Sequence, residues 1–330
     1  MRDRSLLVCV LLSVALFSYA QDEESKASEF TSRGMTAYSA GDYPLAIELF
    51  KKAFMLRPDY SALAYNISCC YALSGDKDSA IAWLEKTFEL GSYLFLEDED
   101  LLSLHEDERY MELAQMAEQK IEELKARQWE PLIRLPDEYS VDKTYPVVIG
   151  LHGFGTNPID FAKSIESAVV ESDYIFCCPY GPYIGGTTAF GWGECEDAEK
   201  RILETIHFLS HNYRIDAARI ILFGFSQGGS VAFCVGLKNP EMFEAIISVA
   251  GYYGHESGYP LEHEGLKTMP VVMMIGENDF QVESNRMAES LMKEKGMTVR
   301  LMIYPGLGHA FPPNSDEEVR KALRWIEGPE

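Results

Sequence analysis

Six short runs of apolar, often β-branched residues recur through the carboxyl-terminal part of the chain. They lie at 145–151, 174–179, 219–224, 243–251, 270–276 and 299–305. Stretches with helical periodicity separate several of them, at 196–212, 227–238 and 282–295. Strands that are apolar on both faces are typical of parallel sheets covered by helices on both sides. The alternation predicts a doubly wound, mostly parallel α/β sheet in residues 129–330, with ligands expected at the carboxyl ends of the strands.

A serine flanked by glycines stands where one of these runs should turn into a helix. Residues 224–228 read Gly-Phe-Ser-Gln-Gly and fit the pattern G-x-S-x-G. Glycines on both sides let strand and helix pass close together, while the serine is held in a strained conformation above the sheet edge. Taken alone, the pentapeptide also fits an ordinary turn in which Ser226 caps a helix, so further residues must decide.

Two groups that could activate Ser226 follow it in the chain. Asp279 comes just after the run 270–276, and His309 comes just after the run 299–305. Both are therefore expected at the same sheet edge as Ser226. A serine hydroxyl needs a base near neutral pH, which His309 would provide, and Asp279 would hold the imidazole in the productive tautomer.

The segment His152–Gly155 predicts the remaining part of the site. It reads His-Gly-Phe-Gly and ends the run 145–151. A strand ending in His-Gly supplies one backbone NH of an oxyanion hole, here expected from Phe154, and the residue after the serine supplies the other, here Gln227. His152 itself is expected to be structural.

With these motifs in view, residues 129–330 resemble an α/β-hydrolase of the phospholipase/carboxylesterase–thioesterase group, often labelled predicted esterases. The resemblance is carried by LHGFG, GFSQGG, GENDFQV and GHAFP, and by the opening LPDEYSVDKTYPVVIGLHG. It implies a Ser226–Asp279–His309 triad that acts on carboxylic esters, with no metal and no organic cofactor. The stretch GTTAFGWGECEDAEKR matches no substrate-defining pattern, so the acyl and alcohol parts of the substrate stay open.

Residues 28–90 repeat themselves at a period of 34, as the pairs Gly41 with Gly75 and Ala46 with Ala80 show. Period and pattern resemble the tetratricopeptide repeat. Two repeats bury too little surface alone, and the helical pattern at 98–128 is expected to complete the stack. Two roles remain open, a helical cap on the second domain and a peptide-binding concave face.

The first twenty residues have the three parts of a secretory signal peptide. Two arginines in MRDRS precede the apolar run LLVCVLLSVALF, and SYA ends the segment. The run is too short for a membrane anchor. Cleavage after Ala20 and export to the periplasm or the extracellular space are therefore expected. The formal charge of -23 argues against binding to nucleic acid or to anionic lipid.

Six cysteines remain after this segment, and an even count in an exported chain permits disulfides. Cys69, Cys70 and Cys234 fall in apolar helical patterns, whereas Cys177 and Cys178 fall in a strand pattern. Buried free cysteines are the preferred interpretation. Their spacing is not of a metal-binding type.

The sequence thus predicts a signal peptide at 1–20, tetratricopeptide-like helical repeats at 21–128 and an α/β-hydrolase domain at 129–330. The predicted function is an exported serine esterase acting on a small-molecule, glycan or lipid ester. Alternatives are a serine peptidase of the same fold and a repeat-based adaptor whose hydrolase domain is inert.

The repeats could bind a protein partner or a large substrate, and the hydrolase domain is expected to fold and work alone. The competing expectation is that the two parts cover each other's apolar surface and need one another.

Overall fold

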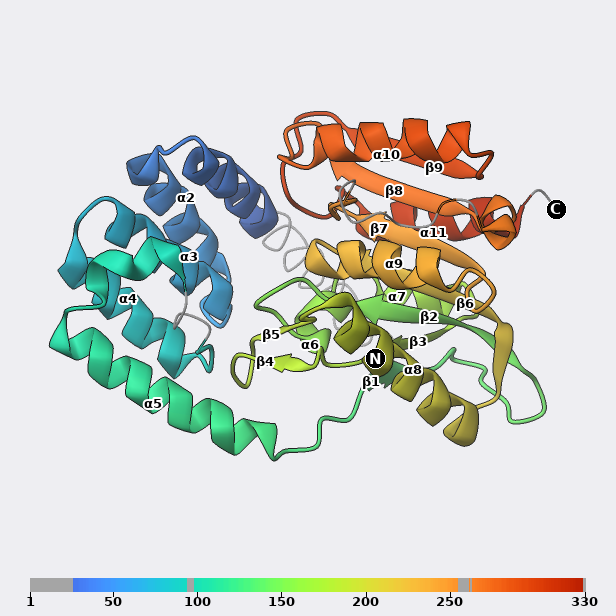
Figure 1. Ribbon diagram of the computed structural model, residues 1–330, viewed down its shortest axis with the longest axis horizontal. Coiled ribbons are helices and arrows are strands. Elements are labelled where there is room, and N and C mark those ends of the chain that lie inside the picture. Colours follow the sequence, from blue (N-terminus) through green and yellow to red (C-terminus); the bar gives the residue numbers. More distant parts are fainter. Residues whose placement is uncertain (1–25, 94–97, 255–260, 262, 329–330) are drawn as a thin grey trace, which may run out of the picture.

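The structure is a computed structural model that describes residues 26–93, 98–254, 261 and 263–328. The predicted signal peptide at 1–20 lies outside the described residues. An all-helical part and an α/β part lie side by side, and α5 leads from the first to the second (Figure 1). Within the described ranges, no helix is both long enough and apolar enough to cross a membrane.

The α/β part is built on one seven-stranded sheet with the strand order β1-β3-β2-β6-β7-β8-β9. The strands are β1 (Leu132–Arg134), β2 (Tyr145–Leu151), β3 (Ile175–Cys178), β6 (Ile215–Phe225), β7 (Ala245–Val249), β8 (Val271–Gly276) and β9 (Val299–Tyr304). β1 pairs antiparallel with β3, and the other neighbours are parallel. The mostly parallel α/β sheet expected from the six apolar runs is confirmed. A short hairpin of β4 (Tyr183–Ile184) and β5 (Phe190–Gly191) stands apart from it.

Helices cover both faces of this sheet, which explains why its strands are apolar on both sides. On one face lie α8 (Cys195–Asn212), α9 (Gln227–Lys238) and α10 (Val282–Glu294); on the other lie α6 (Pro158–Ala162), α7 (Glu166–Glu171) and α11 (Ser315–Glu327). Alternate residues of β2 enter opposite layers, Val147 and Ile149 into the first and Val148 into the second. Complete burial of such a side chain contributes about 1.5–3 kcal/mol to folding.

The all-helical part consists of a helix at 26–39, α2 (Tyr43–Leu56), α3 (Ser61–Leu73), α4 (Lys77–Glu89), the 3₁₀ turn η2 (Glu99–Leu104) and α5 (Glu108–Lys125). Gly41 and Gly75 turn the chain between paired helices with φ of 75° and 86°, a region that favours glycine. Directly after each glycine, an aspartate caps the next helix: Asp42 accepts from the NH of Leu45, and Asp76 from the NH of Ser79. The predicted helical repeats are therefore confirmed.

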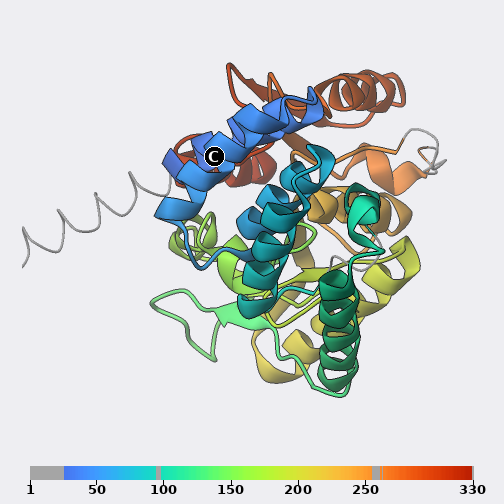
Figure 2. The same ribbon diagram turned by 90° about the vertical axis from the view of Figure 1, so that its left-hand side faces the viewer.

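Residues of α5 complete the stack. Tyr110, Leu113 and Ala117 of α5 are buried in one cluster with Ile81 and Leu84 of α4. In the view turned by 90°, the helices of the repeats stand in front of the hydrolase domain, and α5 flanks them (Figure 2).

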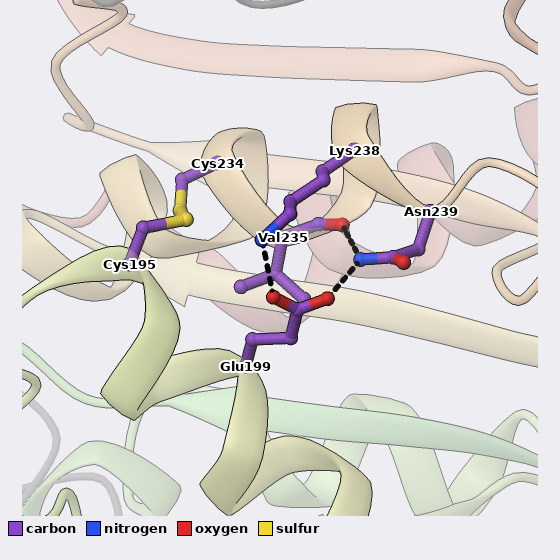
Figure 3. Close-up of a disulfide and its surroundings, with 6 residues drawn as sticks. All are labelled: Cys195, Glu199, Cys234, Val235, Lys238 and Asn239. Atoms are coloured by element: carbon purple, nitrogen blue, oxygen red, sulfur yellow. Dashed lines mark hydrogen bonds and ion pairs between the residues drawn. A yellow bond between two sulfur atoms is a disulfide. The ribbon is translucent and has the colours of Figure 1, made fainter.

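A disulfide joins Cys195 at the start of α8 to Cys234 in α9, with a Cα–Cα distance of 6.2 Å (Figure 3). Beside it, Glu199 of α8 accepts from Lys238 and from Asn239. The preference for a free cysteine at position 234 is therefore wrong. Position 234 faces the first residue of α8, a packing contact that helical periodicity alone does not reveal.

The remaining described cysteines agree with the interpretation from the sequence. Cys69, Cys70, Cys177 and Cys178 are free and buried. Burial raises the pKa of the Cys177 and Cys178 thiols, which favours their protonated form.

Candidate active site

Ser226 lies at the turn between β6 and α9, in a backbone conformation that side-chain-bearing residues rarely adopt. Its φ is 54° and its ψ is -118°. A Cβ on Gly224 would collide with the carbonyl of Gly228, and one on Gly228 would collide with the carbonyl of Leu151. The flanking glycines are therefore required by the close passage of strand and helix, as the motif predicts. The NH of Ser226 donates to the carbonyl of Val249 at 2.9 Å, which holds the turn against β7.

The structure brings Ser226, His309 and Asp279 together in one hydrogen-bonded chain. Nε2 of His309 lies 2.9 Å from Oγ of Ser226, and Nδ1 of His309 lies 2.9 Å from Oδ2 of Asp279. Oδ1 of Asp279 accepts from the NH of Gln281 at 2.8 Å. A carboxylate can only accept a hydrogen bond, so Nδ1 of His309 carries the proton and donates to Asp279, and Nε2 is free to accept from the serine hydroxyl. This arrangement can transfer a proton from Ser226 to His309.

The side chains of Asp279 and His309 are largely shielded from water. The Asp279 side chain is 0% exposed and that of His309 is 13% exposed. The ring of Phe280 stacks on His309 with centroids 4.8 Å apart, and Phe225 lies 5.4 Å away on centroids. Excluding water from Asp279 strengthens its interaction with the imidazole.

His152 has a structural place beneath the segment that carries Phe154. The NH of Gly181 donates to its Nε2 at 3.0 Å, so the proton is on Nδ1, which lies 2.8 Å from the carbonyl of Gly153. Complete burial lowers the pKa of His152 to about 4. The indole NH of Trp192 donates to the His152 carbonyl at 2.8 Å. His152 therefore stays neutral near neutral pH and braces the backbone.

Phe154 and Gln227 are the expected oxyanion donors, and Gln227 directly follows Ser226 in the chain. Phe154 lines the same cavity as Ser226 and His309, and its ring, 55% exposed, packs against Tyr183. Gln227 is the first residue of α9, and its side-chain oxygen accepts from the NH of Trp192 at 3.1 Å. The segment that carries Phe154 is held by a backbone hydrogen bond, since the NH of Gly155 donates to the carbonyl of Phe190 at 2.9 Å.

Ser226 and His309 open into a cavity of about 320 Å³. Residues of both parts of the chain line it. The hydrolase part contributes aromatic side chains, and the helical part contributes residues from the helix at 26–39 and from α3. Lining residues include Met35, Tyr60, Ala62, Leu63, Asn66, Phe154, Phe161, Phe225 and Phe311. Sequence reasoning missed the helical contribution, because no local pattern links a repeat helix to a loop more than two hundred residues away.

One group of potential metal ligands occurs among the described residues, far from any expectation of the sequence. Cys69, Asp98 and Asp100 have ligand atoms within 4.8 Å of one another. Asp100 and Asp98 already accept from the hydroxyls of Tyr38 and Tyr65, respectively. Burial raises the pKa of Cys69 well above its usual range, which opposes the thiolate that a metal needs. The group is better described as a partly buried hydrogen-bonded cluster.

Comparison with known proteins agrees with this architecture. Residues 184–325 match the family model described as the dienelactone hydrolase family, and residues 37–89 match that of the tetratricopeptide repeat. Acyl-protein thioesterase 1 of Gibberella zeae is 27% identical over 210 residues, which cover 54% of this chain and 88% of that protein.

Two solved structures share the fold. An uncharacterised protein from Bacillus cereus matches 90% of this chain and 97% of its own, with a TM-score of 0.52 and 19% identity. Esterase PE8 matches 61% of this chain and 100% of its own, with a TM-score of 0.51 and 22% identity. These structures show the fold, and the sequence matches support an α/β-hydrolase of the esterase and thioesterase type that carries tetratricopeptide-like repeats before its hydrolase domain.

Proposed function

We propose that this protein is an exported serine esterase that cleaves carboxylic esters through an acyl-enzyme. The observation that carries the proposal is the hydrogen-bonded chain from Ser226 through His309 to Asp279, with both distances at 2.9 Å. These three residues follow three different strands, and Ser226 and His309 line a cavity that a substrate could enter. The reaction needs no metal or organic cofactor.

In the proposed reaction, Oγ of Ser226 attacks the ester carbonyl carbon while its proton passes to Nε2 of His309. Asp279 stabilises the imidazolium that forms. The backbone NH groups of Phe154 and Gln227 are assigned to the developing oxyanion, and one such donor typically contributes about 10²–10³ to kcat.

Collapse of the tetrahedral intermediate breaks the bond to the alkoxy group, which takes the proton from His309 and leaves as the alcohol. Water then attacks the acyl-enzyme by the same route, with His309 as base. The acid leaves and Ser226 regains its proton.

Similarity favours ester or thioester bonds over the peptide bond of the alternative function. The relative from Gibberella zeae is named an acyl-protein thioesterase. The second alternative, an adaptor with an inert hydrolase domain, would not require a strained serine. Backbone strain of this kind costs about 1–3 kcal/mol and concentrates at functional sites.

Export is proposed from the signal-peptide pattern, and the disulfide between Cys195 and Cys234 supports it. Disulfides persist in oxidising compartments and are rare in reducing ones. Amino-terminal sequencing of the protein from the periplasm or medium should give Gln21 as the first residue. An exported protein that keeps Met1, or a protein that stays in the cytosol, would contradict this part of the proposal.

A fluorophosphonate probe tests the enzyme against the inert adaptor. Such probes phosphonylate an activated serine, so peptide mapping of the labelled full chain should find the adduct on Ser226. Ser226→Ala should abolish labelling, whereas Ser230→Ala, in the first turn of α9, should retain it. A folded wild-type protein that takes no label would support the inert adaptor.

A further inference from the structure

We infer that the helical repeats form one wall of the substrate cavity and thereby set the size of the apolar group that the ester may carry. The inference rests on the proposed function, because it assigns a substrate-selecting role to residues outside the hydrolase domain. The assigned residues are Met35 on the helix at 26–39 and Ala62 and Leu63 on α3.

The first evidence is the position of the cavity between the two parts of the chain. The helix at 26–39 and α3 are the first helices of the two repeats, and both line the cavity that contains Ser226. In stacked repeats, the small rotation between units creates a concave binding surface. Here that surface faces His309 and Ser226, so a substrate held on it would lie against the reacting atoms.

The second evidence is that hydrogen bonds fix this wall in place. Oγ of Ser32 on the helix at 26–39 accepts from the buried NH of Gly308, the residue before His309, at 2.9 Å. A Cβ on Gly308 would collide with that hydroxyl, so the close approach requires glycine. The repeats therefore touch the catalytic histidine's own loop.

Further contacts hold the rim of the cavity. The guanidinium of Arg57 lies 3.3 Å from a carboxylate oxygen of Asp160, and their side chains are only 16% and 20% exposed. On another side, the Thr188 hydroxyl donates to the carbonyl of Leu90 at 2.9 Å and lies 3.2 Å from the hydroxyl of Ser61. These links join the end of α2 to α6, and α3 and the end of α4 to the loop that carries Thr188, as expected of a built wall.

The chemistry of the lining points to an apolar ligand group. Phe161, Phe225 and Phe311 of the hydrolase part and Met35 and Leu63 of the helical part line the cavity, and the rings of Phe225 and Phe311 stack with centroids 4.7 Å apart. The charge of Arg57 is balanced by Asp160. The cavity volume of about 320 Å³ lies at the lower end of the roughly 300–1,000 Å³ that small-molecule sites span. An ester with an apolar chain or ring fits this space better than a charged one.

The test changes the size of the wall and measures selectivity. Ala62 is half-buried and lines the cavity, so Ala62→Phe should narrow it, while Met35→Ala should widen it. Ala62→Leu is a smaller change of the same kind as Ala62→Phe. Its control is Ala82→Leu, because Ala82 is exposed on α4 and does not line the cavity. The quantity compared is the ratio of kcat/KM for p-nitrophenyl octanoate to that for p-nitrophenyl acetate.

We expect Ala62→Leu and Ala62→Phe to lower this ratio progressively, the latter by about 10-fold, which corresponds to about 1.4 kcal/mol. Met35→Ala should shift the preference toward dodecanoate, and Ala82→Leu should leave the ratio unchanged. A second series of alkyl acetates, in which the alcohol lengthens, shows which side of the ester the wall contacts. A response in either series supports the inference and assigns the acyl or the alkoxy group.

Equal ratios in all variants and in both series, with hydrolysis still dependent on Ser226, would overturn the inference and leave the proposed function standing. Because Met35→Ala and the Ala62 variants change the cavity in opposite directions, misfolding of one does not remove the test. Failure of the folded full chain to hydrolyse any ester or to take the fluorophosphonate label would overturn both proposals.

Discussion

Ser32 lies in the helical repeats, yet its hydroxyl is the hydrogen-bond acceptor for the backbone NH next to His309. The side chain is buried, and 276 residues separate it from Gly308. A buried NH that loses its acceptor costs about 1–3 kcal/mol. The loop can recover part of this free energy by moving, and His309 would move with it. Ser32 is thus a positioning residue for the proposed catalytic base.

We therefore expect Ser32→Ala to lower kcat by about 10-fold, equivalent to about 1.4 kcal/mol of transition-state stabilisation, with little change in KM. Ser32→Thr keeps a hydroxyl and should recover most of the activity. Ser74→Ala, at an exposed position in the same part of the chain, is the matched control. A Ser32→Ala enzyme with an unchanged kcat, or one whose defect lies in KM alone, would contradict this role. Steady-state kinetics on p-nitrophenyl acetate provide the measurement.

His152 makes stability depend on pH. Its pKa is lowered to about 4 in the folded protein by burial, against about 6.5 in an unfolded chain. Between pH 6.5 and pH 4 this imidazole is protonated in the unfolded state but neutral in the folded state. Its contribution to the free energy of unfolding is therefore fully present above pH 6.5 and is lost as the pH falls to 4. The loss is about 3 kcal/mol, at about 1.4 kcal/mol for each pH unit.

The free energy of unfolding, measured with denaturant at pH 7 and pH 4, should therefore fall less in His152→Gln than in the wild type. His211→Gln, at an exposed position, should behave like the wild type. Equal pH dependence in wild type and His152→Gln would show that burial of this imidazole does not contribute to acid sensitivity.

At the residue scale, the sequence predicted that Ser226, Asp279 and His309 would lie close together, and the structure brings them within hydrogen-bond distance. Asp279 and His309 could be placed beside Ser226 because each follows a largely apolar strand, and strand ends meet at one edge of a parallel sheet. Ser32 could not be found in this way, since its partner is distant in the chain and a serine in a helix carries no signal. The structural role of His152 followed from its place before Gly153.

At the scale of elements, α8 and α9 are joined covalently, and α9 begins directly after Ser226. Cys195 and Cys234 are 39 residues apart in sequence. Closing a loop of that length lowers the entropy of the unfolded chain, which raises the free energy of unfolding by up to about 4 kcal/mol at room temperature. Neither cysteine lines the cavity that contains Ser226 and His309. The link therefore stabilises the helices on one face of the sheet.

The double variant Cys195→Ser/Cys234→Ser should have a lower melting temperature than the oxidised wild type and retain its kcat. Adding a reductant should bring the wild type down to the double variant's melting temperature without affecting the variant itself. Thermal melts in both conditions make this comparison. A reductant effect of equal size in both proteins would mean that another pair of cysteines is responsible.

Strands and repeat helices were predictable for different reasons. The strands are continuous apolar runs buried on both faces, and the helices carry caps and glycine turns at fixed spacing. The antiparallel strand β1 and the hairpin of β4 and β5 were not predicted, because they are short. The hairpin depends on distant partners, since the NH of Tyr93 donates to the carbonyl of Gly185 at 2.6 Å.

At the scale of the whole molecule, the repeats cover the active-site side of the hydrolase domain. The sequence favoured a hydrolase domain that works alone, since residues 129–330 contain the whole proposed triad. The cavity wall and the bond from Gly308 to Ser32 favour the competing expectation of mutual dependence. Phe161 is only 4% exposed in the full chain and lines the cavity that the repeats help to enclose. Removing the repeats would therefore expose more of its ring to water.

A chain of residues 129–330 is therefore expected to hydrolyse p-nitrophenyl acetate at least about 10-fold less efficiently than residues 21–330, because the acceptor for Gly308 is lost. It should also lose the preference for longer esters. Soluble yield, melting transition and kcat/KM of the two chains make the comparison. A shorter chain with the same melting temperature, kcat/KM and ester preference would show that the hydrolase domain is independent.

The central claim, that Ser226, His309 and Asp279 act as one catalytic unit on esters, is tested most directly by the kinetics of a double variant. Ser226→Ala and His309→Ala should each lower kcat for p-nitrophenyl acetate by several orders of magnitude in the otherwise intact chain. The double variant should lose little more, because either change alone already disables the unit. Multiplicative losses in the double variant, or single variants that keep wild-type kcat, would contradict the account.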